Sequence, residues 1–189
     1  MRNFKTISTK QYVLVGLLAA LTCVGSAIRI KVPADIVGTS AFHLGNILCA
    51  LSGVLLGPWL GGLAAGMGSA LYDMLDPMYI QDCWLTFLMK GAYGLTVGLI
   101  IRSGKGNWGY GKATLATVAG ALVYAVLYLL KTFFYNGMLF AGLSASAAWI
   151  SVVSKLPATT FNAAVAILAT PFLALVLRNA LKHSHLSLE

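Results

Sequence analysis

A lysine stands inside a long apolar segment of this chain. Lys90 lies in residues 87–94, FLMKGAYG, within an apolar run over residues 84–101. At about 1.5 Å per residue, about seven residues of helix place it roughly 10 Å from the nearer end of that run. A lysine at the centre of a membrane helix costs about 2.5–3.5 kcal/mol on insertion scales, less when the ammonium reaches the interface. Either Lys90 snorkels to lipid headgroups or it faces a polar cavity, and its neighbours favour the cavity.

Polar and aromatic residues from other apolar runs are expected at the same depth as Lys90. His43 and Asn46, for example, begin one run three residues apart, which would place them on one face of a helix. The predicted binding residues are Lys90, Asp73, His43, Asn46, Tyr79, Trp84, Tyr135, Asn136, Lys155 and Asn162. An interfacial belt is the alternative for the three aromatic residues, and snorkelling is the alternative for Lys155. The whole set suits a small polar ligand that contains a ring.

The sequence holds no group of residues expected of an enzyme or a metal site. No nucleophile, base and orienting group come together. Residues 106–113, GNWGYGKA, approach the phosphate-binding pattern G-x-x-x-x-G-K-[ST], but Ala113 replaces the hydroxyl residue and no strand precedes them. Cysteines 23, 49 and 83 lack metal-ligand spacing, and packing is the expected role of the first two. We therefore expect no catalytic residue, no metal and no cofactor.

Composition indicates the kind of fold that must position these residues. Of the 189 residues, 59% are hydrophobic and 10% are charged, whereas a soluble domain carries about 25% charged residues. The long apolar runs predict an all-α polytopic protein of the cell membrane, with a single domain over residues 1–189. The six predicted transmembrane helices cover residues 11–30, 41–56, 59–75, 84–101, 113–135 and 150–177. Gly57 and Pro58 predict a tight turn, and residues 136–149 a long connection.

The net charge of +8 is explained by orientation in the bilayer, so nucleic acid is not an expected partner. Basic residues flank the first and last apolar runs and fill the segment between the fourth and fifth. With six spans they all fall on one side, which predicts cytoplasmic termini. These residues are Arg2, Lys5, Lys10, Arg102, Lys105, Lys112, Arg178 and Lys182. The opposite half of the bilayer carries mixed charge, so the binding site is expected there.

Small residues predict two kinds of close helix packing. Residues 61–70 are rich in glycine and alanine, which favours packing inside the bundle. The first run pairs Gly16 with Ala20 and Ala19 with Cys23, each four residues apart. One of these faces can pack internally and the second can meet another protein. Spacing alone favours the internal use, which is the commoner one.

Two stretches carry a resemblance to a known family. They are residues 43–75, HLGNILCALSGVLLGPWLGGLAAGMGSALYDML, and residues 87–100, FLMKGAYGLTVGLI. The chain resembles the substrate-binding S components of energy-coupling factor (ECF) vitamin transporters, in the branch that holds the riboflavin, hydroxymethylpyrimidine and pyridoxine types. Two positions depart from that branch. Asn46 replaces an acidic residue and Tyr72 replaces a small one, and both leave the ligand open.

The resemblance implies a six-helix subunit that captures a vitamin from outside and topples in the bilayer to carry it inward. Its implied partners are a transmembrane coupling subunit and two cytoplasmic ATPase subunits. Small residues of the first helix make much of that contact in the family, which favours a partner role for Gly16, Ala19, Ala20 and Cys23. Residues 31–40 and 76–83 correspond to the gating loops.

The ligand is expected to be a water-soluble vitamin or precursor, of the pyridoxine or hydroxymethylpyrimidine class. Pantothenate is an alternative because Asn46 is neutral and three lysines lie in the outer half. Riboflavin ranks below it, although the aromatic rim does not exclude riboflavin. The competing hypothesis is a self-sufficient small membrane transporter. Such a protein is expected to show an internal repeat with paired broken helices, and residues 1–94 show no clear likeness to residues 95–189.

Overall fold

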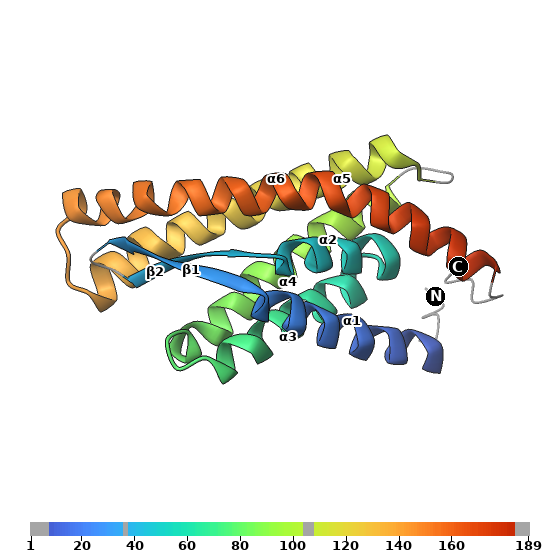
Figure 1. Ribbon diagram of the computed structural model, residues 1–189, viewed down its shortest axis with the longest axis horizontal. Helices are drawn as coiled ribbons and strands as arrows, with labels where there is room; N and C mark the ends of the chain where they lie inside the picture. The colour runs from blue at the N-terminus through green and yellow to red at the C-terminus, as the bar shows by residue number, and fades with distance from the viewer. Residues whose placement is uncertain (1–7, 36–37, 104–107, 184–189) are drawn as a thin grey trace, which may run out of the picture.

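Helices dominate the computed structural model, which describes residues 8–35, 38–103 and 108–183. Figure 1 shows them along the long axis of an elongated bundle, with a β-hairpin towards one end. Within the described ranges the α-helices are α1 (Thr9–Ala27), α2 (Gly45–Leu56), α3 (Pro58–Leu75), α4 (Cys83–Arg102), α5 (Tyr110–Leu130) and α6 (Ala145–His183). The remaining elements are β1 (Arg29–Asp35), β2 (Gly38–His43), the short 3₁₀-helix η1 (Ile80–Asp82) and the π-helix η2 (Lys131–Phe140).

The β-hairpin corrects the expectation of an all-α chain. β1 and β2 pair antiparallel, with Arg29 opposite His43 and Lys31 opposite Ala41. Residues 29–32 alternate charged and β-branched side chains, and this period of two fits a strand. The helix expected from residue 41 therefore begins at Gly45. His43 lies in β2, so the prediction that it shares a helix face with Asn46 was wrong.

The long connection expected at residues 136–149 is also mostly helical. α5 continues directly into η2, and α6 begins at Ala145 after a short turn. The alanines at the start of α6 are strong helix formers, which favours a helix there although the segment is rich in small residues. α6 also continues through Pro157 and Pro171, a pattern that packed membrane helices tolerate.

Four helical stretches in the described part of the chain are long and apolar enough to cross a membrane. They cover Thr9–Ala27, Ile80–Arg102, Tyr110–Phe140 and Ala145–Leu181. α2 is a shorter apolar helix of 12 residues, and α3 lies beside both α2 and α4. In Figure 1, α1 begins and α6 ends at the same end of the bundle, away from the hairpin.

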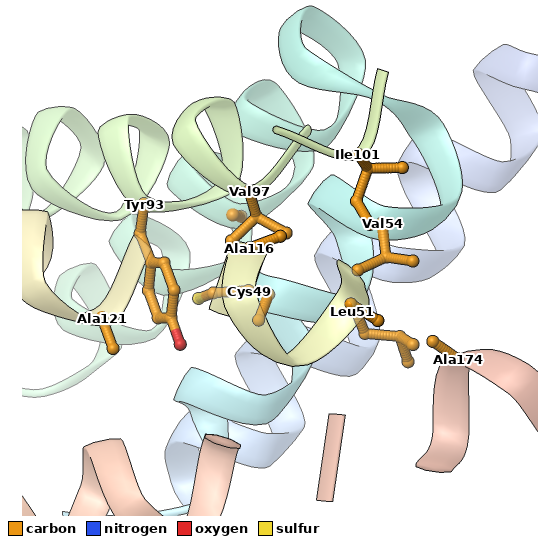
Figure 2. Close-up of a cluster of buried hydrophobic side chains, with 12 residues drawn as sticks. Cys49, Leu51, Val54, Tyr93, Val97, Ile101, Ala116, Ala121 and Ala174 are labelled. Carbon is orange, nitrogen blue, oxygen red and sulfur yellow. The ribbon is translucent and has the colours of Figure 1, made fainter. Parts of the chain in front are cut away.

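Close backbone packing joins α2, α3 and α4. A Cβ on Gly53 would lie 2.4 Å from the carbonyl oxygen of Gly94, and a Cβ on Gly94 would lie 2.7 Å from that of Gly61. This approach is possible only without side chains, which confirms the internal packing predicted for residues 61–70. Figure 2 shows the adjoining apolar core, where Cys49 is buried near Val97.

The predicted turn between α2 and α3 is confirmed. Gly57 adopts a positive φ of 79°, which glycine accommodates without strain. Pro58 then occupies the first turn of α3, where its missing N–H costs no helical hydrogen bond. Arg102 from the end of α4 donates to the carbonyl oxygen of Leu56 at 3.3 Å. This contact satisfies a terminal carbonyl of α2 and ties three helix ends together.

Candidate functional site

A polar cavity of about 160 Å³ lies among α3, α4, α5, η2, α6 and the hairpin. Seven of the predicted binding residues line it: His43, Asp73, Tyr79, Lys90, Asn136, Lys155 and Asn162. Most come from elements far apart in the sequence, so the fold converges polar groups on one place in an apolar bundle. The other three predicted residues, Asn46, Trp84 and Tyr135, are not among its lining residues.

Lys90 is the most deeply buried cation of the cavity wall, with 4% of its surface exposed. Its ammonium donates a hydrogen bond to Asn46 Oδ1. It also lies 3.9 Å from the centre of the Tyr124 ring, a cation–π distance. Asn46 is therefore behind the wall, where it positions Lys90. The ion pairs Lys31–Asp76 and Lys131–Asp82 do not include Lys90.

Asp73 supplies a buried carboxylate from the last turns of α3, with 7% of its surface exposed. Thr86 on α4 lines the cavity as well. Because Lys90 and Asp73 both line the cavity without forming an ion pair with each other, the polar end of each can meet an occupant of the cavity.

Side chains of α6 complete the free edge of β2. Asn162 accepts from the His43 backbone N–H at 3.0 Å and donates to the Ala41 carbonyl at 2.8 Å. Lys155 donates to the Thr39 carbonyl at 3.0 Å. These bonds satisfy backbone groups that an edge strand would leave unpaired. Lys155 and Asn162 thus fasten the hairpin over the cavity as well as lining it.

A second set of contacts fastens the hairpin to the segment between α3 and α4. The Lys31 ammonium lies 2.6 Å from Asp76 Oδ2, and the Thr39 and Tyr79 hydroxyls lie 2.9 Å apart. The Arg29 guanidinium lies 3.7 Å from the centre of the Tyr72 ring. The first two contacts join the parts of residues 31–40 and 76–83 that the structure describes, and the third joins β1 to α3; residues 36 and 37 lie outside the described part.

The Lys31–Asp76 pair shifts the titration of both partners. The hydrogen bond to Asp76 raises the pKa of Lys31 above its ordinary value. Burial alone would raise the pKa of Asp76. The hydrogen bonds from Lys31, the Met78 N–H and the Tyr72 hydroxyl together outweigh burial and hold that pKa below its ordinary value. The pair is therefore ionised across the neutral range.

The fold also brings in residues that were not predicted as ligand contacts. Asp82 Oδ2 lies 2.5 Å from the Lys131 ammonium and accepts from Asn136 Nδ2 at 3.2 Å. Tyr124 and Tyr128 stack with ring centres 5.9 Å apart and line the same wall. Tyrosines spaced four apart were a usable signal, because that spacing puts them on one helix face.

Trp84 and Tyr135 pack against each other instead of lining the cavity. Their rings meet edge to face with centres 6.0 Å apart, and Trp84 is 53% exposed. This position fits the interfacial belt that was the alternative for the aromatic residues.

The predicted partner surface on α1 divides into an outer and an inner part. Gly16 and Ala20 are exposed, Cys23 is half-buried, and Ala19 is buried. A Cβ on Gly68 of α3 would lie 2.2 Å from the Ala19 carbonyl oxygen. Ala19 therefore packs against α3 inside the bundle, away from the exposed face that carries Gly16 and Ala20.

Comparison with known proteins decides the family. The sequence model described as "ECF-type riboflavin transporter, S component" matches residues 6–179. The chain belongs to this family. It is therefore a multi-pass membrane S component that serves vitamin transport, and its family is a transporter family rather than an enzyme family.

Two curated relatives match parts of the S component. A Pyrococcus woesei protein described as "Uncharacterized protein in gap 3'region" is 36% identical over 110 residues, which cover 58% of this chain and 69% of the relative. A "UPF0397 protein" of Streptococcus gordonii is 35% identical over 95 residues, which cover 50% of this chain and 48% of the relative. Both alignments extend over half of the S component or more.

Proposed function

We propose that this S component captures a water-soluble vitamin or precursor in the cavity and delivers it across the cell membrane. It does so as the substrate-specific subunit of an ATP-driven importer, together with a transmembrane coupling subunit and two cytoplasmic ATPase subunits. The observation that carries the proposal is the polar cavity of about 160 Å³ inside an apolar bundle. Placing polar and ionisable side chains inside a membrane costs free energy, so a cluster of them there indicates a substrate site.

The orientation proposed for this subunit has six spans, cytoplasmic termini and an outward-facing cavity. Lys10, Arg102, Lys112 and Arg178 lie near the helix ends opposite the hairpin, as the positive-inside rule requires of the cytoplasmic side. Arg2, Lys5 and Lys105, which support the same orientation by sequence, lie outside the described residues, as does the side chain of Lys182. The hairpin end then faces outward.

The proposed ligand contains a single ring, as pyridoxine and hydroxymethylpyrimidine do. Typical ligand pockets have volumes of about 300–1,000 Å³, and this cavity of about 160 Å³ is small by comparison. Tyr124 and Tyr128 offer a face for the ring, while Lys90, Asp73 and Asn136 offer both signs of charge and an amide for polar substituents.

Riboflavin is the second candidate, because the description of the matching family names riboflavin transporters. It requires the cavity to widen when the hairpin separates from the segment between α3 and α4. Pantothenate is favoured by the cations on the cavity wall, which include Lys90 and Lys155. Direct titration of the purified protein with all four compounds ranks them.

Reconstitution tests the transport role. The S component is purified with and without the coupling and ATPase subunits and placed in liposomes loaded with ATP. Association with the coupling subunit, and uptake only when all subunits are present, are the expected results. Concentrative uptake by the chain alone, without association with the coupling subunit, would instead show that the protein is a self-sufficient transporter.

A further inference from the structure

One wall of the cavity is formed by side chains spaced four residues apart along α5 and η2. Tyr124, Tyr128, Thr132 and Asn136 all line it. On an α-helix, a step of four residues overshoots a full turn by about 40°. Three such steps in a continuous α-helix would carry Asn136 about 120° from the direction of Tyr124, and away from the cavity.

The change from α5 to η2 removes this drift. The π-helix begins at Lys131, and its i→i+5 bonds place more residues in each turn than an α-helix has. A step of four residues then falls short of a full turn. The side-chain direction therefore rotates one way from Tyr124 to Tyr128 and the opposite way from Thr132 to Asn136. Thr132 and Asn136 consequently stay in line with Tyr124 and Tyr128.

Contacts on two sides hold this uncommon conformation. On the cavity side, Asp82 bonds both Lys131 and Asn136, five residues apart. On the far side, Phe133 packs against Trp149 of α6 with ring centres 5.3 Å apart. π-helical segments occur mostly as single turns, frequently at functional sites. The ten residues of η2 are therefore held in place by their neighbours, and so are the side chains that η2 places on the cavity wall.

The bond to Asp82 also orients the Asn136 amide. A carboxylate can only accept hydrogen bonds, so the amide nitrogen must face Asp82 and the oxygen must face elsewhere. Among the residues that the structure describes, no donor reaches Asn136 Oδ1. Because Asn136 lines the cavity, its Oδ1 is the amide atom left to accept from an occupant, on the same wall as Tyr124 and Tyr128 and about two helical turns beyond Tyr128.

We infer that η2 sets the ligand specificity of this S component: Asn136 Oδ1 accepts a hydrogen bond from an O–H or N–H of a ligand whose ring lies against Tyr128. This inference rests on the proposed function and narrows it to ring compounds that carry an O–H or N–H donor on a substituent that extends from the ring towards η2. The π-helical register is what brings the acceptor to the same side as the tyrosines.

The test is a double-mutant cycle between protein and ligand. Wild type, Asn136→Leu and Phe134→Leu proteins are titrated with pyridoxine, hydroxymethylpyrimidine, riboflavin and pantothenate. The best ligand is then compared with analogues in which each O–H or N–H is methylated in turn. Phe134 is the matched control, because it belongs to the same π-helix, is 58% exposed and is not among the residues that line the cavity.

One methylated analogue is expected to bind wild type about tenfold more weakly than its parent. Asn136→Leu should bind the parent about tenfold more weakly but bind that analogue as wild type does, whereas Phe134→Leu should behave as wild type. Equal weakening of parent and all analogues by Asn136→Leu would show a merely structural role and overturn the inference. Binding of none of the four compounds by wild type would overturn the proposed function, and the inference with it.

Discussion

Replacing Lys90 with methionine separates a binding role of the lysine from a structural one. The substitution keeps the apolar stem and removes the ammonium that faces the cavity. Asn46 Oδ1 then loses its donor, which costs about 1–3 kcal/mol for a buried group. The cation–π contact with Tyr124 is also lost, at about 2 kcal/mol for a desolvated site.

The removed charge compensates for most of that loss. Taking an ammonium out of the membrane interior recovers about 2.5–3.5 kcal/mol. The balance is a destabilisation of about 0–2 kcal/mol, so Lys90→Met should fold and melt close to wild type. A ligand that meets the ammonium in wild type should bind at least about tenfold more weakly, which corresponds to about 1.4 kcal/mol.

The assay measures thermal unfolding in detergent and ligand affinity by calorimetry on the same preparations. Lys112→Met is the matched control, because Lys112 bonds the Ser103 carbonyl at the opposite end of the bundle. Unchanged affinity in Lys90→Met would refute the reasoning and leave the lysine a structural role. Loss of folding would refute the energy balance, and Lys90→Met with Asn46→Leu would then show whether the orphaned amide caused it.

Four further predictions concern the hairpin and α1. The pKa of Asp76 is lowered in the folded protein, so its bond to Lys31 stabilises the closed hairpin at pH values above the ordinary carboxylate pKa. This stabilisation is lost as pH falls through the pKa of Asp76 in the folded protein. Ligand dissociation should therefore accelerate at that pH in wild type but not in Asp76→Asn. The raised pKa of Lys31 predicts that the same stabilisation of the hairpin is also lost as pH rises through the pKa of Lys31 in the folded protein. Lys31→Met should not show this alkaline loss. Asn162→Ala should lower the unfolding free energy by about 2–4 kcal/mol and speed hydrogen exchange in β2, because two backbone groups lose their partner; unchanged exchange would contradict the edge-pairing role. Gly16→Val should fold and bind ligand but co-purify less with the coupling subunit, whereas Ala19→Val should impair folding itself; the reverse pattern would show that the partner surface is misassigned.

Hydropathy and helical spacing predicted the parts of this fold that depend on local pattern. The span containing Lys90, the Gly57–Pro58 turn and the glycine-rich packing of α3 follow from composition and backbone sterics. The hairpin was missed because residues 29–32 form only a short alternating segment beside a long apolar run. The π-helix η2 was missed because helix type depends on contacts with Asp82 and Trp149 that are distant in sequence.

The candidate site was only partly predictable for the same reason. Depth along each helix identified Lys90, Asp73 and Lys155, since depth follows from counting residues. The direction in which a side chain points around its helix was harder to predict. Trp84, for example, packs its ring against Tyr135 and does not line the cavity. Asn46 was correctly placed near Lys90 but not as its hydrogen-bonding partner, because that contact requires the relative rotation of α2 and α4.

Mass spectrometry of the molecule retained by the purified S component tests the central claim most directly. The account predicts one small ring-containing vitamin or precursor, in near-equal amount to wild-type protein and strongly reduced in Lys90→Met. Lys112→Met should retain it as wild type does. A well-folded wild-type protein that retains no such molecule, and binds none when vitamins are added, would contradict the account.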